Sequence, residues 1–204
     1  MKQALLLFAL TALLAGCGSG GGAAGLPWSD DFSSVSTWQA ESDAAAQVSV
    51  EAGVLRVFVA VPNQLAWATA GRDLRDFHLT VETTQIAGPD DNEYGVLVRL
   101  QDPANFYRFS ISGDGYVLVD KFVAGQMELM GATWMPAEAI RQGEASNVLE
   151  VICRGAEMTF IVNGSEVARV RDTTFTHGDI GLYAGTFYEG GVEVHFDNLI
   201  VTEP

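Results

Sequence analysis

The sequence predicts an all-β fold, an antiparallel β-sandwich of about twelve strands. Short segments of alternating apolar and polar residues recur along the chain, with Gly, Pro, Asn and Asp between them, which is typical of this class. Asn163-Gly164 separates two such segments, and Asn-Gly is the strongest short hairpin signal. Strands do not alternate with helical patterns, so a parallel sheet is not expected.

Each expected strand is an alternating or apolar run that ends at a turn signal. Ala52-Gly53 predicts a first hairpin, and the turns at 101–104 and 113–115 separate three successive strands in the middle of the chain. One short helical turn is expected near 136–140. The expected strands cover residues 48–50, 54–59, 77–83, 94–100, 105–112, 116–123, 127–134, 147–153, 157–162, 166–171, 178–184 and 192–201.

The last expected strand has one apolar face. By alternation, one face should hold Val192, Val194, Phe196, Asn198 and Ile200. We expect this strand to lie beside an N-terminal strand around residues 30–32.

The N-terminal residues predict an export signal. Lys2 precedes the apolar run 4–14, which is shorter than the ~20 residues that span a bilayer and fits the apolar region of a secretory signal. The run Leu14-Ala15-Gly16-Cys17 resembles a bacterial lipoprotein signal, in which cleavage before Cys17 leaves a lipidated N-terminus. The alternative is an ordinary signal peptide that contains a cysteine. We expect a signal peptide at 1–16, lipidated Cys17 with a Gly-rich tether at 17–26, and one domain at 27–204.

Charge and cysteine content limit the classes of partner. The chain has 11 basic and 26 acidic residues. Without Lys2 and the rest of the signal, the formal net charge is −16, so the chain should repel nucleic acid. Contact with a membrane is expected only through the lipid, on the extracytoplasmic side. Cys153 is then the single cysteine left, and it is expected to be a buried small hydrophobe.

Several motifs together resemble a known family. They include Tyr94-Gly95-Val96-Leu97, Gly113-Asp114-Gly115-Tyr116, Gly178-Asp179-Ile180-Gly181 and Phe196-Asp197-Asn198-Leu199. Their order and spacing over about 28–202 resemble the concanavalin A-like jelly-roll domains of bacterial surface proteins, especially the laminin-G-like and 3-keto-disaccharide hydrolase-like domains. The resemblance implies a jelly-roll sandwich. The fold hosts lectins, glycosidases and adhesion modules, so it does not fix the activity.

The residues favour a protein without catalytic activity. Glucanases on this fold place Glu-x-Asp-x-Glu along one strand, and this sequence has no such triplet. The nearest acidic group, Asp90-Asp91-Asn92-Glu93, is interpreted as a solvated turn. His78, His177 and His195 are scattered without metal-ligand spacing.

Binding of a glycan has more candidate residues. Sugar recognition uses an aromatic ring against a pyranose, with polar groups nearby for the hydroxyls. An alternative is that the aromatic residues belong to the core. The candidate ligand-binding residues are Trp67, Arg99, Tyr107, Arg108, Asp120 and Trp134. The charged ones lie on expected strands, where charge implies an open face.

The resemblance also implies one structural Ca²⁺ ion where the first and last strands meet. Its ligands would be Asp30, Asp31 and Asp197, because Ca²⁺ takes several hard oxygen ligands. The alternative is an acidic turn and a solvated Asp197.

Together these observations predict a lipid-anchored, extracytoplasmic module that binds a glycan or another surface ligand. One alternative is a glycoside hydrolase-like enzyme acting on a disaccharide or glucan. The other is a scaffold or sensor module that binds a protein.

Overall fold

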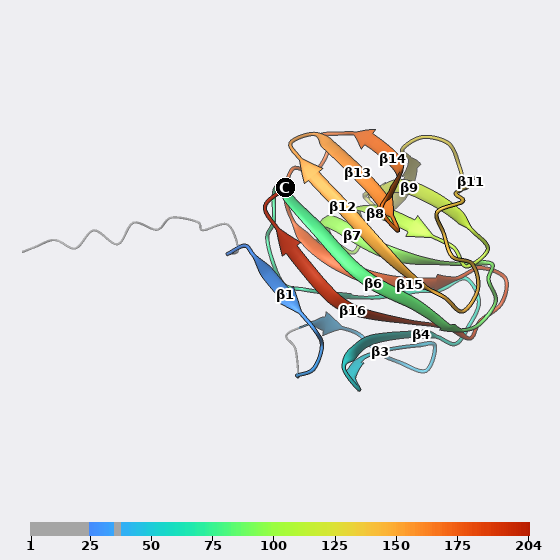
Figure 1. Cartoon of the computed structure of the whole chain (residues 1–204). Coiled ribbons are helices and arrows are strands. Elements are labelled where there is room, and N and C mark those ends of the chain that lie inside the picture. The colour runs from blue at the N-terminus through green and yellow to red at the C-terminus, as the bar shows by residue number, and fades with distance from the viewer. Residues whose placement is uncertain (1–24, 35–37) are drawn as a thin grey trace, which may run out of the picture.

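The computed structural model describes residues 25–34 and 38–204, and its regular structure there is entirely β-strand. Sixteen strands form two antiparallel eight-stranded sheets that stack as a sandwich (Figure 1). The first sheet contains, in spatial order, β14 (Ser165–Arg171), β13 (Glu157–Val162), β12 (Ser146–Arg154), β6 (Phe77–Ala87), β16 (Val192–Thr202), β4 (Val54–Val59) and β3 (Ala46–Glu51), with β1 (Trp28–Asp30) also paired to β16. The second contains β10 (Gln126–Leu129), β9 (Tyr116–Val123), β8 (Asn105–Ile111), β7 (Asn92–Asp102), β15 (Asp179–Thr186), β5 (Leu65–Thr69) and β2 (Gln39–Ala40), with β11 (Met135–Pro136) paired to β9. The predicted fold class is confirmed.

The two hairpins predicted from their turn residues are present. Ala52 and Gly53 connect β3 to β4 with φ of 52° and 81°, and Asn163 and Gly164 connect β13 to β14 with φ of 50° and 81°. Two successive residues with positive φ match the right-handed twist of the strands. These turns therefore set the register of both hairpins.

The core lies between the sheets and is filled mainly by alternate residues of the longer strands. Leu149, Val151 and Cys153 of β12 illustrate the pattern, since all three are fully buried. Burial raises the pKa of the Cys153 thiol to about 12, so the thiol stays protonated and inert. Its predicted role as a small core hydrophobe is confirmed.

The last strand, β16, pairs with the first strand, β1, and so brings the N- and C-terminal parts of the domain together. It lies between β6 and β4 (red in Figure 1), and β1 pairs with its second half, with Asp30 opposite Leu199. The predicted neighbour is confirmed, but the predicted face is wrong beyond Phe196. A bulge at Asn198, where φ is 51°, adds a residue and reverses the alternation. Leu199 therefore enters the core, and Ile200 is 48% exposed.

The remaining differences concern short elements. Strands β2, β5 and β11 were not expected as strands, and the expected strand at 127–134 ends at Leu129 as β10. The sequence of β5, Leu-Ala-Trp-Ala-Thr, has few of the β-branched residues that favour strands. Residues 136–140 form no helix, only a turn in which the Ile140 N–H donates to the Ala137 carbonyl at 3.1 Å.

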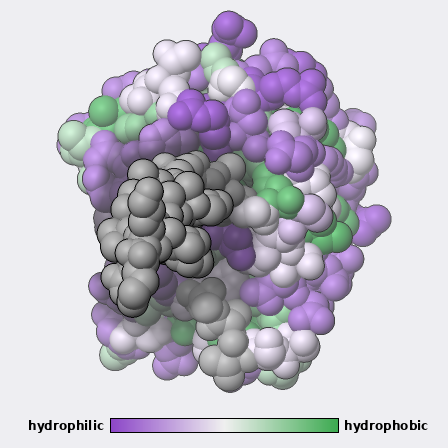
Figure 2. All heavy atoms as spheres, turned by 90° about the vertical axis from the view of Figure 1, so that its left-hand side faces the viewer, coloured by the Kyte–Doolittle hydropathy of each residue, from purple (hydrophilic) through white to green (hydrophobic). Residues whose placement is uncertain are grey.

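The predicted signal peptide, lipidated Cys17 and most of the tether lie outside the described residues. Within residues 25–34 and 38–204, no helix is long and apolar enough to cross a membrane. Figure 2 shows one side of the domain, where hydrophilic residues predominate and apolar ones are scattered.

Candidate ligand-binding site

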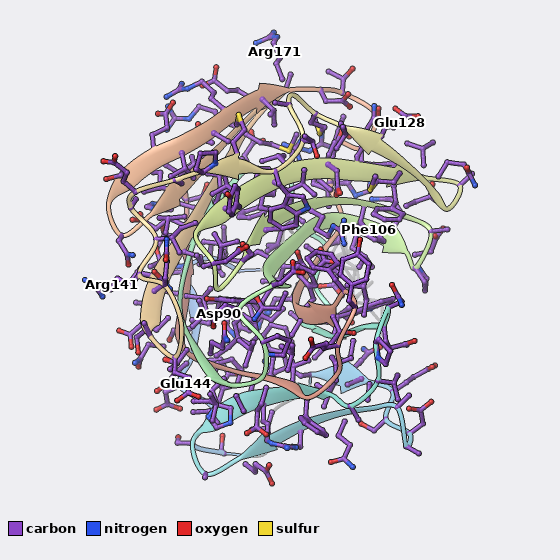
Figure 3. All side chains as sticks on the ribbon, turned by 90° about the vertical axis from the view of Figure 1, so that its right-hand side faces the viewer. Asp90, Phe106, Glu128, Arg141, Glu144 and Arg171 are labelled. Atoms are coloured by element: carbon purple, nitrogen blue, oxygen red, sulfur yellow. The ribbon has the colours of Figure 1, made fainter. Side chains whose placement is uncertain are left out.

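The outer face of the second sheet carries a second apolar cluster, separate from the main core. Leu97, Phe106 and Tyr183 are buried there, with Leu65, Trp67, Leu100 and Phe122 partly buried around them. These seven residues are called the outer-face cluster. Figure 3 shows Phe106 within densely packed side chains, whereas Glu128 and Arg171 project outward from the rim. The outer face of the second sheet therefore has a small apolar core of its own.

Three charged side chains form a buried ion cluster on the same face. The Arg108 guanidinium donates from Nε and Nη2 to the Asp120 carboxylate, at 3.0 and 2.6 Å. Its Nη1 lies 2.8 Å from Glu93 Oε2. The exposed fractions are 4% for Arg108, 5% for Glu93 and 0% for Asp120. Because burial of an unpaired charge is costly, each carboxylate depends on the single guanidinium.

Tyr183 belongs to the outer-face cluster and also contacts the ion cluster. Its hydroxyl bonds with Ser110 Oγ and donates to Glu93 Oε2 at 3.5 Å. Burial, reinforced by the charge of Glu93, raises the pKa of Tyr183 well above its ordinary value. Burial likewise raises the pKa of Glu93, although the charge of Arg108 opposes this shift. Two carboxylates share one cation here, which limits how far Arg108 can offset the upward shift of the Glu93 pKa.

A groove of about 610 Å³ lies beside the outer-face cluster, at the β2 and β5 edge of the sheet. Residues of β2, the loop after it, β5 and the β7–β8 turn form its walls. They are Gln39, Ala40, Glu41, Ser42, Asp43, Ala46, Gln64, Leu65, Ala66, Trp67, Thr69, Leu100 and Pro103. Within the described chain, β2 opposes only Ala68 and Thr69 of β5. The edge of β5 before Ala68 therefore has no partner strand on the groove side and borders the groove instead.

Trp67 is the aromatic side chain of the groove, and the sheet fixes its position. It lies directly opposite Tyr183 across the β5–β15 pair. Its ring centroid is 6.5 Å from that of Phe106, with the planes tilted by 47°. Trp67 is only partly buried. It therefore packs against other residues of the outer-face cluster and still presents surface to the groove.

The structure separates Arg99 from this site. A bulge in β7, where Arg99 has φ of 51°, turns its side chain away from the outer face. The fully buried guanidinium donates to the carbonyls of Gly155, Phe175 and Arg75 at 2.7, 3.1 and 3.2 Å. The expectation that the Arg99 charge marks an open face is therefore corrected: Arg99 joins three loops.

Tyr107 and Trp134 also lie apart from the groove. Tyr107 is buried on the core side of β8, where its hydroxyl donates to Asp172 Oδ1 at 2.6 Å. Burial, together with the hydrogen bond to Asp172, raises the pKa of Tyr107 to about 12. Trp134 is half-buried and packs edge-to-face on Phe187, with centroids 5.9 Å apart. Of the predicted binding residues, the outer face thus brings together Trp67, Arg108 and Asp120.

The three aspartates predicted to hold calcium bond to nearby donors. Asp30 accepts from the Phe32 N–H at 2.9 Å and from Trp38 Nε1 at 3.0 Å, so both its oxygens are engaged. Asp31 accepts from Ser33, and Asp197 from the Asn198 N–H. In residues 25–34 and 38–204, no group of three His, Cys, Asp or Glu side chains is placed to hold a metal. Calcium therefore stays a prediction from the resemblance alone.

Glu93 is the residue that sequence reasoning missed. It was interpreted as part of a solvated turn, but β7 begins at Asn92 and Glu93 is buried. The signal was the alternation itself: Tyr94 and Val96 face the core, so Glu93 and Leu97 face outward. The run of acidic and amide residues before it obscured this pattern.

Comparisons with known proteins agree with this architecture. A family model described as a 3-keto-alpha-glucoside-1,2-lyase-like domain matches residues 27–202. No curated protein matches the chain. The carbohydrate-binding module CBM66 from Bacillus subtilis is similar in structure, with 15% identity, a TM-score of 0.64, and coverage of 83% of this chain and 97% of the module.

Two glucanases have similar folds as well. The Bacillus licheniformis beta-glucanase has 12% identity and a TM-score of 0.63, with coverage of 89% of this chain and 100% of that one. A prokaryotic beta-1,3-1,4-glucanase (lichenase) from a mouse hindgut metagenome has 10% identity and a TM-score of 0.64, with coverage of 87% and 99%. At such identities these similarities establish the fold alone.

Proposed function

Because the chain belongs to the 3-keto-alpha-glucoside-1,2-lyase-like domain family, we propose that its sandwich binds a glycan in the groove beside Trp67. The observation that carries the proposal is Trp67 itself, a partly buried indole on the wall of a groove of about 610 Å³. An indole ring stacks on the apolar face of a pyranose. The amides of Gln39 and Gln64 on the same walls can both donate to and accept from sugar hydroxyls.

The proposed role is binding without catalysis. Glycoside hydrolysis needs one carboxyl group to protonate the leaving oxygen and a second to attack the sugar or activate water. On the outer face, Glu93 and Asp120 are the neighbouring carboxyl groups, and both are buried against Arg108. Both carboxyl groups are thus already engaged by the same guanidinium, which supports the binding role.

The alternative is a glycoside hydrolase-like enzyme acting on a disaccharide or glucan, favoured by the glucanases that share the fold. Incubation of the protein with disaccharides and glucans, followed by chromatography, separates the two. The binding role predicts no products. Products that depend on Glu93 or Asp120 would establish the enzyme instead.

We place the domain outside a bacterial membrane, held by lipid on Cys17. The support is the sequence: an apolar run of signal-peptide length ends three residues before Cys17, and Gly-rich residues follow the cysteine. A module attached in this way would meet glycans at the cell surface.

A glycan-array screen of the purified protein, run with calcium and again with a chelator, tests the binding role. We expect a defined group of glycans to bind in both conditions. Absence of binding across a broad array by demonstrably folded protein would overturn the proposal.

A further inference from the structure

Among the residues that the structure describes, those that line the groove carry negative charge and no positive charge. Glu41 and Asp43 are on its walls, and none of its lining residues is Lys or Arg. Asp43 is held in place, since its Oδ1 accepts from the N–H groups of Ala45 and Ala46 at 2.8 and 2.9 Å. Glu41 is exposed. One carboxylate is therefore fixed at the groove, and a second can adjust its position.

Three cations on neighbouring elements are engaged by other groups. Arg108 is buried against Glu93 and Asp120. Arg99 is bound to loop carbonyls. The Arg72 guanidinium lies over the Trp28 ring, 4.1 Å from its centroid. Each of these three therefore has a partner of its own, and none of them lines the groove.

Building on the proposed function, we propose that the groove selects neutral glycans and rejects glycans that carry carboxylate groups. Recognition of a sugar carboxylate normally uses an Arg or Lys partner. Here an acidic sugar would meet two carboxylates and no cation. Repulsion between like charges at a partly enclosed site weakens binding and thereby discriminates between ligands. Neutral hydroxyls meet amides, hydroxyls and Trp67 without that cost.

Glu41 is the specificity residue of the groove that can be changed alone. Asp43 holds a turn, so its substitution would disturb the loop. Glu41 is exposed, and Glu41→Lys places a cation on the groove wall without emptying any buried space. Glu138→Lys makes the same change of net charge at an exposed residue that does not line the groove. Comparison of the two variants separates the effect of charge at the groove on binding from the effect of the total charge of the protein.

Isothermal titration in dilute buffer would use gluco-, galacto- and manno-oligosaccharides, each with a counterpart whose primary alcohols are oxidised to carboxylates. For the wild type and Glu138→Lys, we expect the oxidised form of a bound oligosaccharide to bind about tenfold more weakly or worse. In Glu41→Lys the gap should shrink to about threefold or less. Equal or tighter binding of the oxidised form by the wild type would overturn the inference and leave glycan binding standing. Absence of binding by every oligosaccharide would overturn both.

Discussion

Arg108 and Asp120 face each other directly on β8 and β9 and share two hydrogen bonds, at 3.0 and 2.6 Å. The turn around residues 112–116 sets this pairing, because it places Ile111 opposite Val117 and every earlier pair follows in register. Glu93 of β7 completes the buried ion cluster. This cluster supports Tyr183, which lies opposite the groove residue Trp67.

Loss of one ion-cluster member should be strongly destabilising. Asp120→Ala leaves Arg108 with one carboxylate partner in a buried position, and we expect a loss of about 3–5 kcal/mol in the free energy of unfolding. Replacing all three members, with Arg108→Met, Asp120→Leu and Glu93→Gln, should restore much of that loss, since no charge then remains buried. Urea denaturation measures both. A cost below about 1 kcal/mol for Asp120→Ala would contradict this account.

Stability should depend on pH through Glu93. Burial raises the pKa of this carboxyl group in the folded protein, so its stabilising contribution is complete below its unfolded pKa and is lost as pH rises through the folded pKa. Relative to Glu93→Gln, the wild type should therefore be more stable at pH 4 than at pH 7.5. Denaturation of both proteins at both pH values checks the sign. If the stability of the wild type relative to Glu93→Gln instead increased from pH 4 to pH 7.5, the raised pKa of Glu93 would be refuted.

Arg99 should matter for stability and not for binding. Arg99→Ala removes the donor to three loop carbonyls, and each acceptor left buried costs about 1–3 kcal/mol. We therefore expect a marked fall in the midpoint of thermal unfolding, whereas glycan affinity below that midpoint should be unchanged. Arg169→Ala is the control, because Arg169 is half-exposed and forms surface ion pairs. If folded Arg99→Ala lost glycan affinity, Arg99 would have to be counted as part of the binding site after all.

Membrane attachment should depend on Cys17. In bacterial cells, wild-type protein should be recovered with the membrane fraction and partition into detergent, because several acyl chains on one residue bind firmly. Cys17→Ser should be recovered in the soluble or secreted fraction. Mass spectrometry of the N-terminus identifies the lipid directly. Membrane recovery of Cys17→Ser equal to that of the wild type would exclude the anchor.

Local sequence signals predicted most of the fold and little of the site. Asn163-Gly164 and Ala52-Gly53 set their hairpins because positive φ at successive residues is a local requirement. The bulges at Arg99 and Asn198 were not predictable in this way. Neither is a glycine, and each reverses the alternation from which side-chain directions were predicted. For this reason Arg99 was placed on an open face and Ile200 in the core.

The site itself depends on contacts between distant segments. Trp67 meets Tyr183 only because β5 and β15 pair across more than a hundred residues of sequence. Trp67 was predicted as a binding residue from the sequence, but strand β5, which carries it, was not predicted. The groove also needs β2 to be short enough to leave part of β5 open. Neither condition is a property of the local sequence.

The most direct test of glycan binding in the groove is isothermal titration of the strongest array ligand against Trp67→Ala and Tyr188→Ala. Tyr188 is 85% exposed and does not line the groove, so it controls for the loss of a surface aromatic ring. We predict that Trp67→Ala weakens binding by about tenfold or more, with Tyr188→Ala within about twofold of the wild type. Wild-type affinity in folded Trp67→Ala would contradict the placement of the ligand in this groove.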